Sequence, residues 1–76
     1  MQVDVQILTG RMVTISISPD DTIEQVSFKI KAKEGINPDQ QILLFKGTMM
    51  AMDGLVDEYG IYEHTTIFLT LRNLGG

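Results

Sequence analysis

The chain has 76 residues, of which 43% are hydrophobic, and carries a formal net charge of −4 at pH 7. A chain of this length forms one small domain, and its apolar share separates it from disordered sequences. The absence of cysteine excludes disulfides, zinc–thiolate sites and a cysteine nucleophile, and six Lys and Arg residues are too few for the basic face that binds nucleic acid or an anionic membrane.

The sequence also lacks membrane and targeting signals. No apolar run approaches the ~20 residues of a membrane span, and the N-terminus lacks the basic and apolar regions of a signal peptide. We therefore expect a soluble protein, cytoplasmic if it is expressed in a cell, although no motif fixes its compartment. With one histidine and no cysteine, we expect no metal and no cofactor.

The first residues predict a β-hairpin. Apolar and polar side chains alternate from Met1 to Ile7 and again from Val13 to Ile17, with Met12 on the outward side of the second run, which is the period of strands with one buried face. Gly10 lies between the two runs and suits the positive φ of a hairpin turn. The two strands are therefore expected to pair antiparallel.

A helix with well-marked ends is predicted next. Thr22 and Gln25 have the spacing of a capping box, and Gly35 supplies a left-handed stop. Apolar residues recur at i, i+3 and i+7 and predict the buried face: Ile23, Val26 and Ile30.

Two more strands are predicted, separated by an irregular region. Residues 42–45 are short, apolar and β-prone, and residues 65–72 alternate, whereas residues 48–64 show turn signals without a regular period. In the last strand the inward side chains are expected to be Ile67, Leu69 and Leu71, and the outward ones Phe68 and Thr70. The order of elements indicates an α+β domain in which one helix crosses a mixed sheet and the two terminal strands pair in parallel.

The chain resembles the ubiquitin family along its whole length. The segments MQ, LTG, DTIE, KEGI, PDQQ, LR and the closing GG stand at the same positions as in that family, without a gap. The resemblance implies the ubiquitin-like β-grasp fold, a mixed sheet of four to five strands packed on one helix. It places the domain at residues 1–72 and a flexible C-terminal tail at residues 73–76.

The resemblance also implies a chemistry. In the family, the C-terminal carboxylate is adenylated, passed to enzyme cysteines as a thioester and joined to a target lysine, and chains grow on the modifier's own lysines. Arg72, Gly75 and Gly76 match the conjugation tail, and Lys29 and Lys33 match acceptor lysines. The family's other acceptor positions hold Gln6, Arg11, Ser27, Thr48 and Glu63, while new lysines stand at Lys31 and Lys46.

The surface that partners of the family recognise is altered. Its positions hold Leu8, Leu44, Phe68 and Thr70, so that an apolar patch survives in a different shape. Ile42 and Leu74 stand where the family has arginines. The resemblance therefore implies weakened binding to ubiquitin-system enzymes.

No catalytic residue is predicted. His64 is the single histidine, and a turn residue tolerant of positive φ is its favoured role over a general base. Thr14 lies on an outward strand face without an evident base beside it. The carboxylates lack the spacing of a calcium-binding loop. We therefore expect no enzymatic activity.

Positions that hold the fold keep apolar residues and caps, while the surface is rewritten. Agreement between propensity, pattern and caps is what protein design aims for. The sequence alone therefore favours a designed, monomeric ubiquitin-fold scaffold with no selected biochemical activity and no expected partner. The alternatives are a diverged ubiquitin-like modifier conjugated through Gly76 and a ubiquitin variant selected to bind a ubiquitin-system enzyme.

Overall fold

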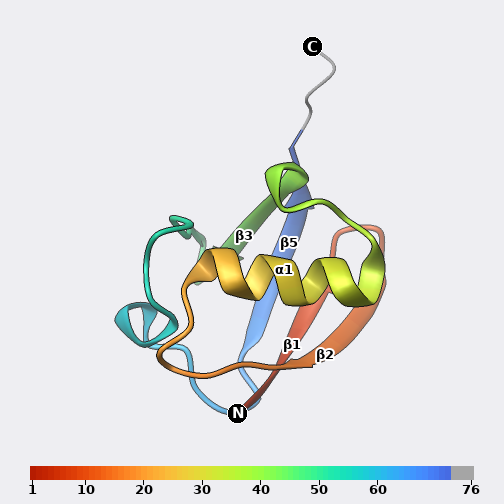
Figure 1. Ribbon diagram of the computed structural model, residues 1–76. Coiled ribbons are helices and arrows are strands. Elements are labelled where there is room, and N and C mark those ends of the chain that lie inside the picture. Colours follow the sequence, from red (N-terminus) through yellow and green to blue (C-terminus); the bar gives the residue numbers. More distant parts are fainter. Residues whose placement is uncertain (73–76) are drawn as a thin grey trace.

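One helix lies across one face of a mixed five-stranded sheet in the computed structural model, which describes residues 1–72 (Figure 1). The elements in chain order are β1 Gln2–Ile7, β2 Met12–Ser16, α1 Ile23–Glu34, η1 Pro38–Gln40, β3 Gln41–Phe45, β4 Thr48–Met49, η2 Val56–Tyr59 and β5 Thr66–Leu71. The strand order is β2-β1-β5-β3-β4, with β1 and β5 parallel. The predicted α+β class and the parallel pairing of the terminal strands are confirmed.

The hairpin of β1 and β2 forms as predicted. Val3 pairs with Ile15 and Val5 with Val13 across the antiparallel ladder. Gly10 has φ 104°, a conformation open to glycine but strained for other residues, and its amide donates to the carbonyl of Ile7 at 2.8 Å. The turn therefore sets the register that buries alternate residues of β1.

Helix α1 begins and ends at the predicted residues. The Thr22 hydroxyl accepts from the Gln25 amide at 3.1 Å, and Gln25 Oε1 accepts from the Thr22 amide at 2.7 Å. Gly35 at φ 74° donates its amide to the carbonyl of Lys31 at 2.8 Å. The capping box and the left-handed stop satisfy backbone groups that a helix end leaves without partners.

The core lies between α1 and the covered face of the sheet. Its buried apolar residues are Val3, Val5, Ile7, Ile15, Ile17, Ile23, Val26, Ile30, Leu43, Phe45, Met50, Val56, Ile61, Ile67 and Leu69. The predicted helix face is fully buried in this set. Each such side chain contributes about 1.5–3 kcal/mol relative to its exposed state, which lets the chain fold without a disulfide.

Leu71 lies on the inward side of β5, opposite the buried Gln41, but it is not buried as the prediction implied. Its side chain is 51% exposed, although it follows the buried Leu69 by two residues. Strand β1 ends at Ile7, the register partner of Leu69, so no β1 residue lies beside Leu71. Alternation gives the face of a strand but not where the cover over that face ends.

Strand β4 and the two 3₁₀ helices were not predicted, because each is too short to show a period. Residues Lys46 and Gly47 join β3 to β4 in a two-residue turn, with φ 52° and 75°. Positive φ at both central residues is the signature of the type I′ turns that suit hairpins. Gly60 and His64 also have positive φ, as the sequence predicted for His64.

Candidate functional site

The face of the sheet that α1 leaves uncovered carries a row of cross-strand partners. Met49 pairs with Leu44, Leu44 with Phe68, Phe68 with Gln6 and Gln6 with Met12. Residues directly opposite each other on neighbouring strands point to the same face. The row therefore runs across all five strands, and every member except Gln6 is apolar.

The predicted patch lies along this row and at one side of it. Leu44 and Phe68 are direct partners, and Phe68 is 44% exposed. Leu8 follows the end of β1, is 66% exposed, and lines with Thr70 an open hollow of about 240 Å³. The structure therefore brings the four patch positions onto two adjoining features, the row and the hollow.

The sequence marks Met49, with Met50 and Met52, as candidates for an adaptable binding surface, but it does not place Met12 and Met49 at the two ends of this row. Met12 is 52% and Met49 is 62% exposed. The outward position of Met12 followed from alternation, but its place in line with Phe68 depends on strand order, which one sequence does not give. Flexible, polarisable Met side chains around an aromatic ring make a surface that adapts to different partners. The row can therefore contact an apolar partner surface.

Two lysines of α1 bind the edge strand of the sheet. Lys29 Nζ donates to the carbonyl of Ser16 at 3.0 Å, and Lys33 Nζ donates to the carbonyl of Thr14 at 2.6 Å. Among the residues that the structure describes, β2 pairs only with β1, so carbonyls on its other edge lack a strand partner there. Four helix residues rise about 6 Å and two strand residues about 6.7 Å, and this match lets both contacts form together.

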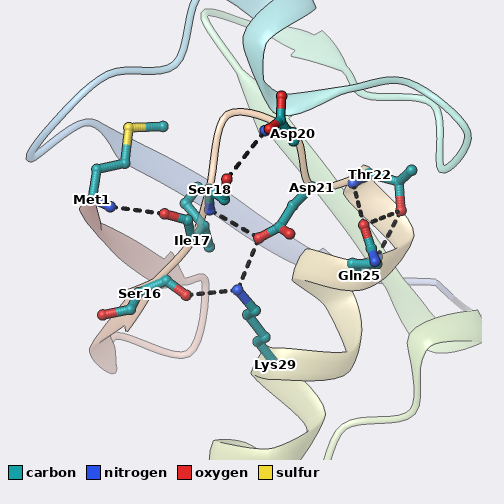
Figure 2. A network of polar contacts seen from close by, with 9 residues as sticks. All are labelled: Met1, Ser16, Ile17, Ser18, Asp20, Asp21, Thr22, Gln25 and Lys29. Atoms are coloured by element: carbon teal, nitrogen blue, oxygen red, sulfur yellow. Dashed lines mark hydrogen bonds and ion pairs between the residues drawn. The ribbon is translucent and has the colours of Figure 1, made fainter.

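Asp21 joins Lys29 to the start of α1, as Figure 2 shows. Its Oδ2 accepts from Lys29 Nζ at 2.8 Å and from the Ser18 amide at 2.9 Å. These two hydrogen bonds, first that from Lys29, hold the pKa of the Asp21 carboxyl below its usual value. In the same view the Met1 amino group donates to the carbonyl of Ile17 at 2.8 Å.

The predicted conjugation tail is described only at its first residue. Arg72 is exposed, and its amide donates to the carbonyl of Gln40 at 2.7 Å. Gly75 and Gly76, and with them the predicted tail at residues 73–76, lie outside the described residues. The boundary after residue 72 therefore stays a prediction.

The prediction that Thr14 has no base beside it is wrong. Thr14 Oγ1 donates to Asp4 Oδ1 at 2.8 Å across the β1–β2 ladder, so Thr14 does have a carboxylate beside it. The pair is exposed and lies on neighbouring strands, where such bonds stabilise a sheet. Within residues 1–72, no three His, Cys, Asp or Glu side chains gather as metal ligands.

Comparison with known proteins identifies the family. The model of the ubiquitin family matches residues 1–74, nearly the whole chain. The chain belongs to the ubiquitin family. Its five-stranded mixed sheet on one helix is the ubiquitin-like β-grasp fold that the resemblance implied, and this prediction is confirmed.

Three relatives align with the whole chain. It is 38% identical to the ubiquitin-like protein NEDD8 of Dictyostelium discoideum, over 76 residues that make up 99% of that protein. It is 33% identical to ubiquitin-like protein 1 of Schizosaccharomyces pombe and to the NEDD8-like protein RUB3 of Arabidopsis thaliana, each covered to 97%. These relatives favour the diverged-modifier alternative over the designed scaffold. In the part of this ubiquitin-family chain that the structure describes, no helix is long and apolar enough to cross a membrane.

Proposed function

We propose that this protein is a ubiquitin-like modifier, joined to amine targets through the carboxylate of Gly76, and has no enzymatic activity of its own. The observation that carries the proposal is the family match over residues 1–74, together with relatives named as ubiquitin-like proteins. The retained Arg72, Gly75 and Gly76 support it, because they supply the tail on which the family's activation chemistry depends.

The row from Met49 to Met12 supports a second part of this proposal. It offers exposed apolar surface around Leu44 and Phe68 on the face that α1 does not cover. An enzyme that carries the thioester, or a partner protein that recognises the modifier, can bury these side chains. The expected affinity is low, because a few side chains of this size supply only part of what a stable complex needs.

The test of conjugation is charging of the tail. The protein is incubated with ATP and, in separate reactions, with activating enzymes of ubiquitin and of NEDD8-type modifiers. We expect a higher-mass adduct that is cleaved by an added thiol, which takes over the acyl group and releases the enzyme cysteine, as happens with a thioester. The matched control lacks Gly75 and Gly76 and must give no adduct. If no enzyme charges the intact tail, the designed scaffold is the better interpretation.

The row is tested with two exposed aromatic residues. Phe68→Ala removes a ring at the centre of the row, whereas Phe28→Ala removes one that is 53% exposed on α1. We expect Phe68→Ala alone to weaken binding to the enzyme that charges the tail, by roughly tenfold for a central aromatic contact. Equal effects of the two substitutions would contradict docking on the row. Tight binding to one enzyme without charging would favour the selected-binder alternative.

A further inference from the structure

The lysines of the chain divide into two pairs by their contacts. Lys29, Lys31, Lys33 and Lys46 are the four lysines of the sequence. Lys29 and Lys33 donate to carbonyls of β2, and Lys29 also pairs with Asp21. Among residues 1–72, neither Lys31 nor Lys46 has a hydrogen-bond acceptor or an ion-pair partner.

The helix geometry explains why Lys31 differs from its neighbours. Two residues along an α-helix correspond to a rotation of about 200°. Because Lys29 and Lys33 point to β2, Lys31 points away from it, and it is exposed. Phe28, three residues before Lys31, lies on the same side of α1 and is also exposed. Lys31 thus has no carbonyl of the sheet within its reach.

Lys46 stands in a turn rather than on a helix, between β3 and β4, and is also exposed. Its Nζ lies 5.4 Å from the centre of the Phe45 ring. A cation over an aromatic face at an exposed site gains little, and the contact uses none of the directional hydrogen bonds that hold Lys29.

We infer that Lys31 and Lys46 are the acyl-acceptor amines of this protein, and that Lys29 and Lys33 are structural lysines despite matching the family's acceptor positions. In the transfer, the neutral Nζ attacks the carbonyl carbon of a thioester on Gly76 of a second copy. The carbon–sulfur bond breaks, the sulfur leaves as a thiol after taking up the proton that the nitrogen releases, and an amide forms. Lys29 and Lys33 must first break their contacts to β2, which slows them.

The inference rests on the proposed function, because that function supplies the thioester. The difference in reactivity between the two pairs of lysines can be tested without a thioester, by a simple acetylating reagent. The folded protein is treated with a limiting amount of N-hydroxysuccinimidyl acetate. Cleavage after glutamate gives one peptide, residues 25–34, that holds Lys29, Lys31 and Lys33. Fragment-ion mass spectrometry then compares the three lysines within a single molecule, and Lys46 is measured in the next peptide.

We expect Lys31 and Lys46 to be acetylated about fivefold faster than Lys29 and Lys33, the factor that corresponds to losing an exposed charge-assisted hydrogen bond. The difference should vanish in urea, where no lysine is held. Equal rates for Lys29, Lys31 and Lys33 in the folded protein would overturn the inference.

A transfer assay tests which lysines accept the acyl group from the thioester itself. The donor has all four lysines changed to Arg, so that it offers no lysine as acceptor. The acceptor lacks Gly75 and Gly76, so that it cannot form the thioester. We expect the acceptor K31R/K46R to lose the amide-linked product and the matched acceptor K29R/K33R to keep it. The reverse pattern would overturn the inference. Failure to charge the donor would contradict the proposed function instead, and the acetylation rates would then decide the inference.

Discussion

Lys29 Nζ lies 2.8 Å from Asp21 Oδ2 and thereby ties the second turn of α1 to the segment that leads into it. The Asp21 side chain is only 17% exposed, and its carboxylate also accepts from the Ser18 amide. The contact thus holds together the end of the hairpin and the start of the helix (Figure 2).

The stability of the protein should therefore depend on pH through Asp21. In the folded state the pKa of this carboxyl lies below its ordinary value of 3.8, mainly because of the hydrogen bond from Lys29. A carboxyl with a lowered folded pKa stabilises the fold above its unfolded pKa, and this contribution is lost as the pH falls through the folded pKa. We expect urea unfolding to show this loss of stability as the pH is lowered from neutral through the acidic range below 3.8.

The matched variant for this prediction is Asp21→Asn, which keeps an acceptor for the Ser18 amide but cannot titrate. It should be less stable than the wild type at neutral pH and should lose less stability on acidification. Parallel stability profiles of the two proteins would show that Asp21 does not carry the effect.

Removing the helix cap should destabilise the whole domain. Thr22→Ala deletes the hydroxyl that accepts from the Gln25 amide, and the loss of such a cap costs about 1 kcal/mol. Thr22→Ser keeps the hydroxyl and should stay within a few tenths of a kcal/mol of the wild type. Thermal unfolding followed by circular dichroism measures both. A Thr22→Ser variant as unstable as Thr22→Ala would argue for the lost methyl group rather than the cap.

The turn between β3 and β4 offers a stabilising substitution. Lys46 has φ 52°, which most side chains adopt with strain and Asn tolerates. We expect Lys46→Asn to raise the free energy of unfolding by about 0.5 kcal/mol, because Asn adopts this φ with less strain. The gain stays small because the weak contact with Phe45 is lost at the same time. Gly47→Ala, at φ 75°, should act in the opposite direction. Chemical denaturation of both variants gives the comparison, and a destabilised Lys46→Asn would contradict the prediction.

Gln41 should matter more than its polar character suggests. Its side chain is fully buried, and Nε2 donates to the carbonyls of Ser27 and Ile36 at 2.9 Å each. Gln41→Leu leaves both carbonyls without this donor, at a cost of about 1–3 kcal/mol. The exposed neighbour provides the control, since Gln40→Leu should change the stability little. Equal unfolding midpoints for the two variants would show that these hydrogen bonds contribute nothing net.

Local signals in the sequence predicted the features that depend on neighbouring residues. Thr22, Gln25 and Gly35 define α1 because caps act within one turn. The alternation of β1 predicted its buried face, because a shift of one residue in the strand pairing would move all its apolar side chains to the opposite face. The positive φ of His64 followed from a residue type that tolerates it.

Features that need two distant segments could not be predicted in this way. The contact of Lys33 with the Thr14 carbonyl can be predicted only when the distance between α1 and β2 is known. The row through Phe68 requires the strand order. The buried amide of Gln41 has no signal at all in its local sequence. The patch was found through the resemblance, but its extension to Met12 and Met49 needed the paired strands.

The position of β5 governs how the domain is assembled. This strand lies between β1 and β3 at the centre of the sheet (Figure 1), yet residues 66–71 are made after every other element. Without β5 the pair β2-β1 and the pair β3-β4 share no strand, so the inner edges of β1 and β3 have no partner. Pairing across so many residues is slow to form. We therefore expect the two halves of the sheet to join during synthesis only after β5 has left the ribosome.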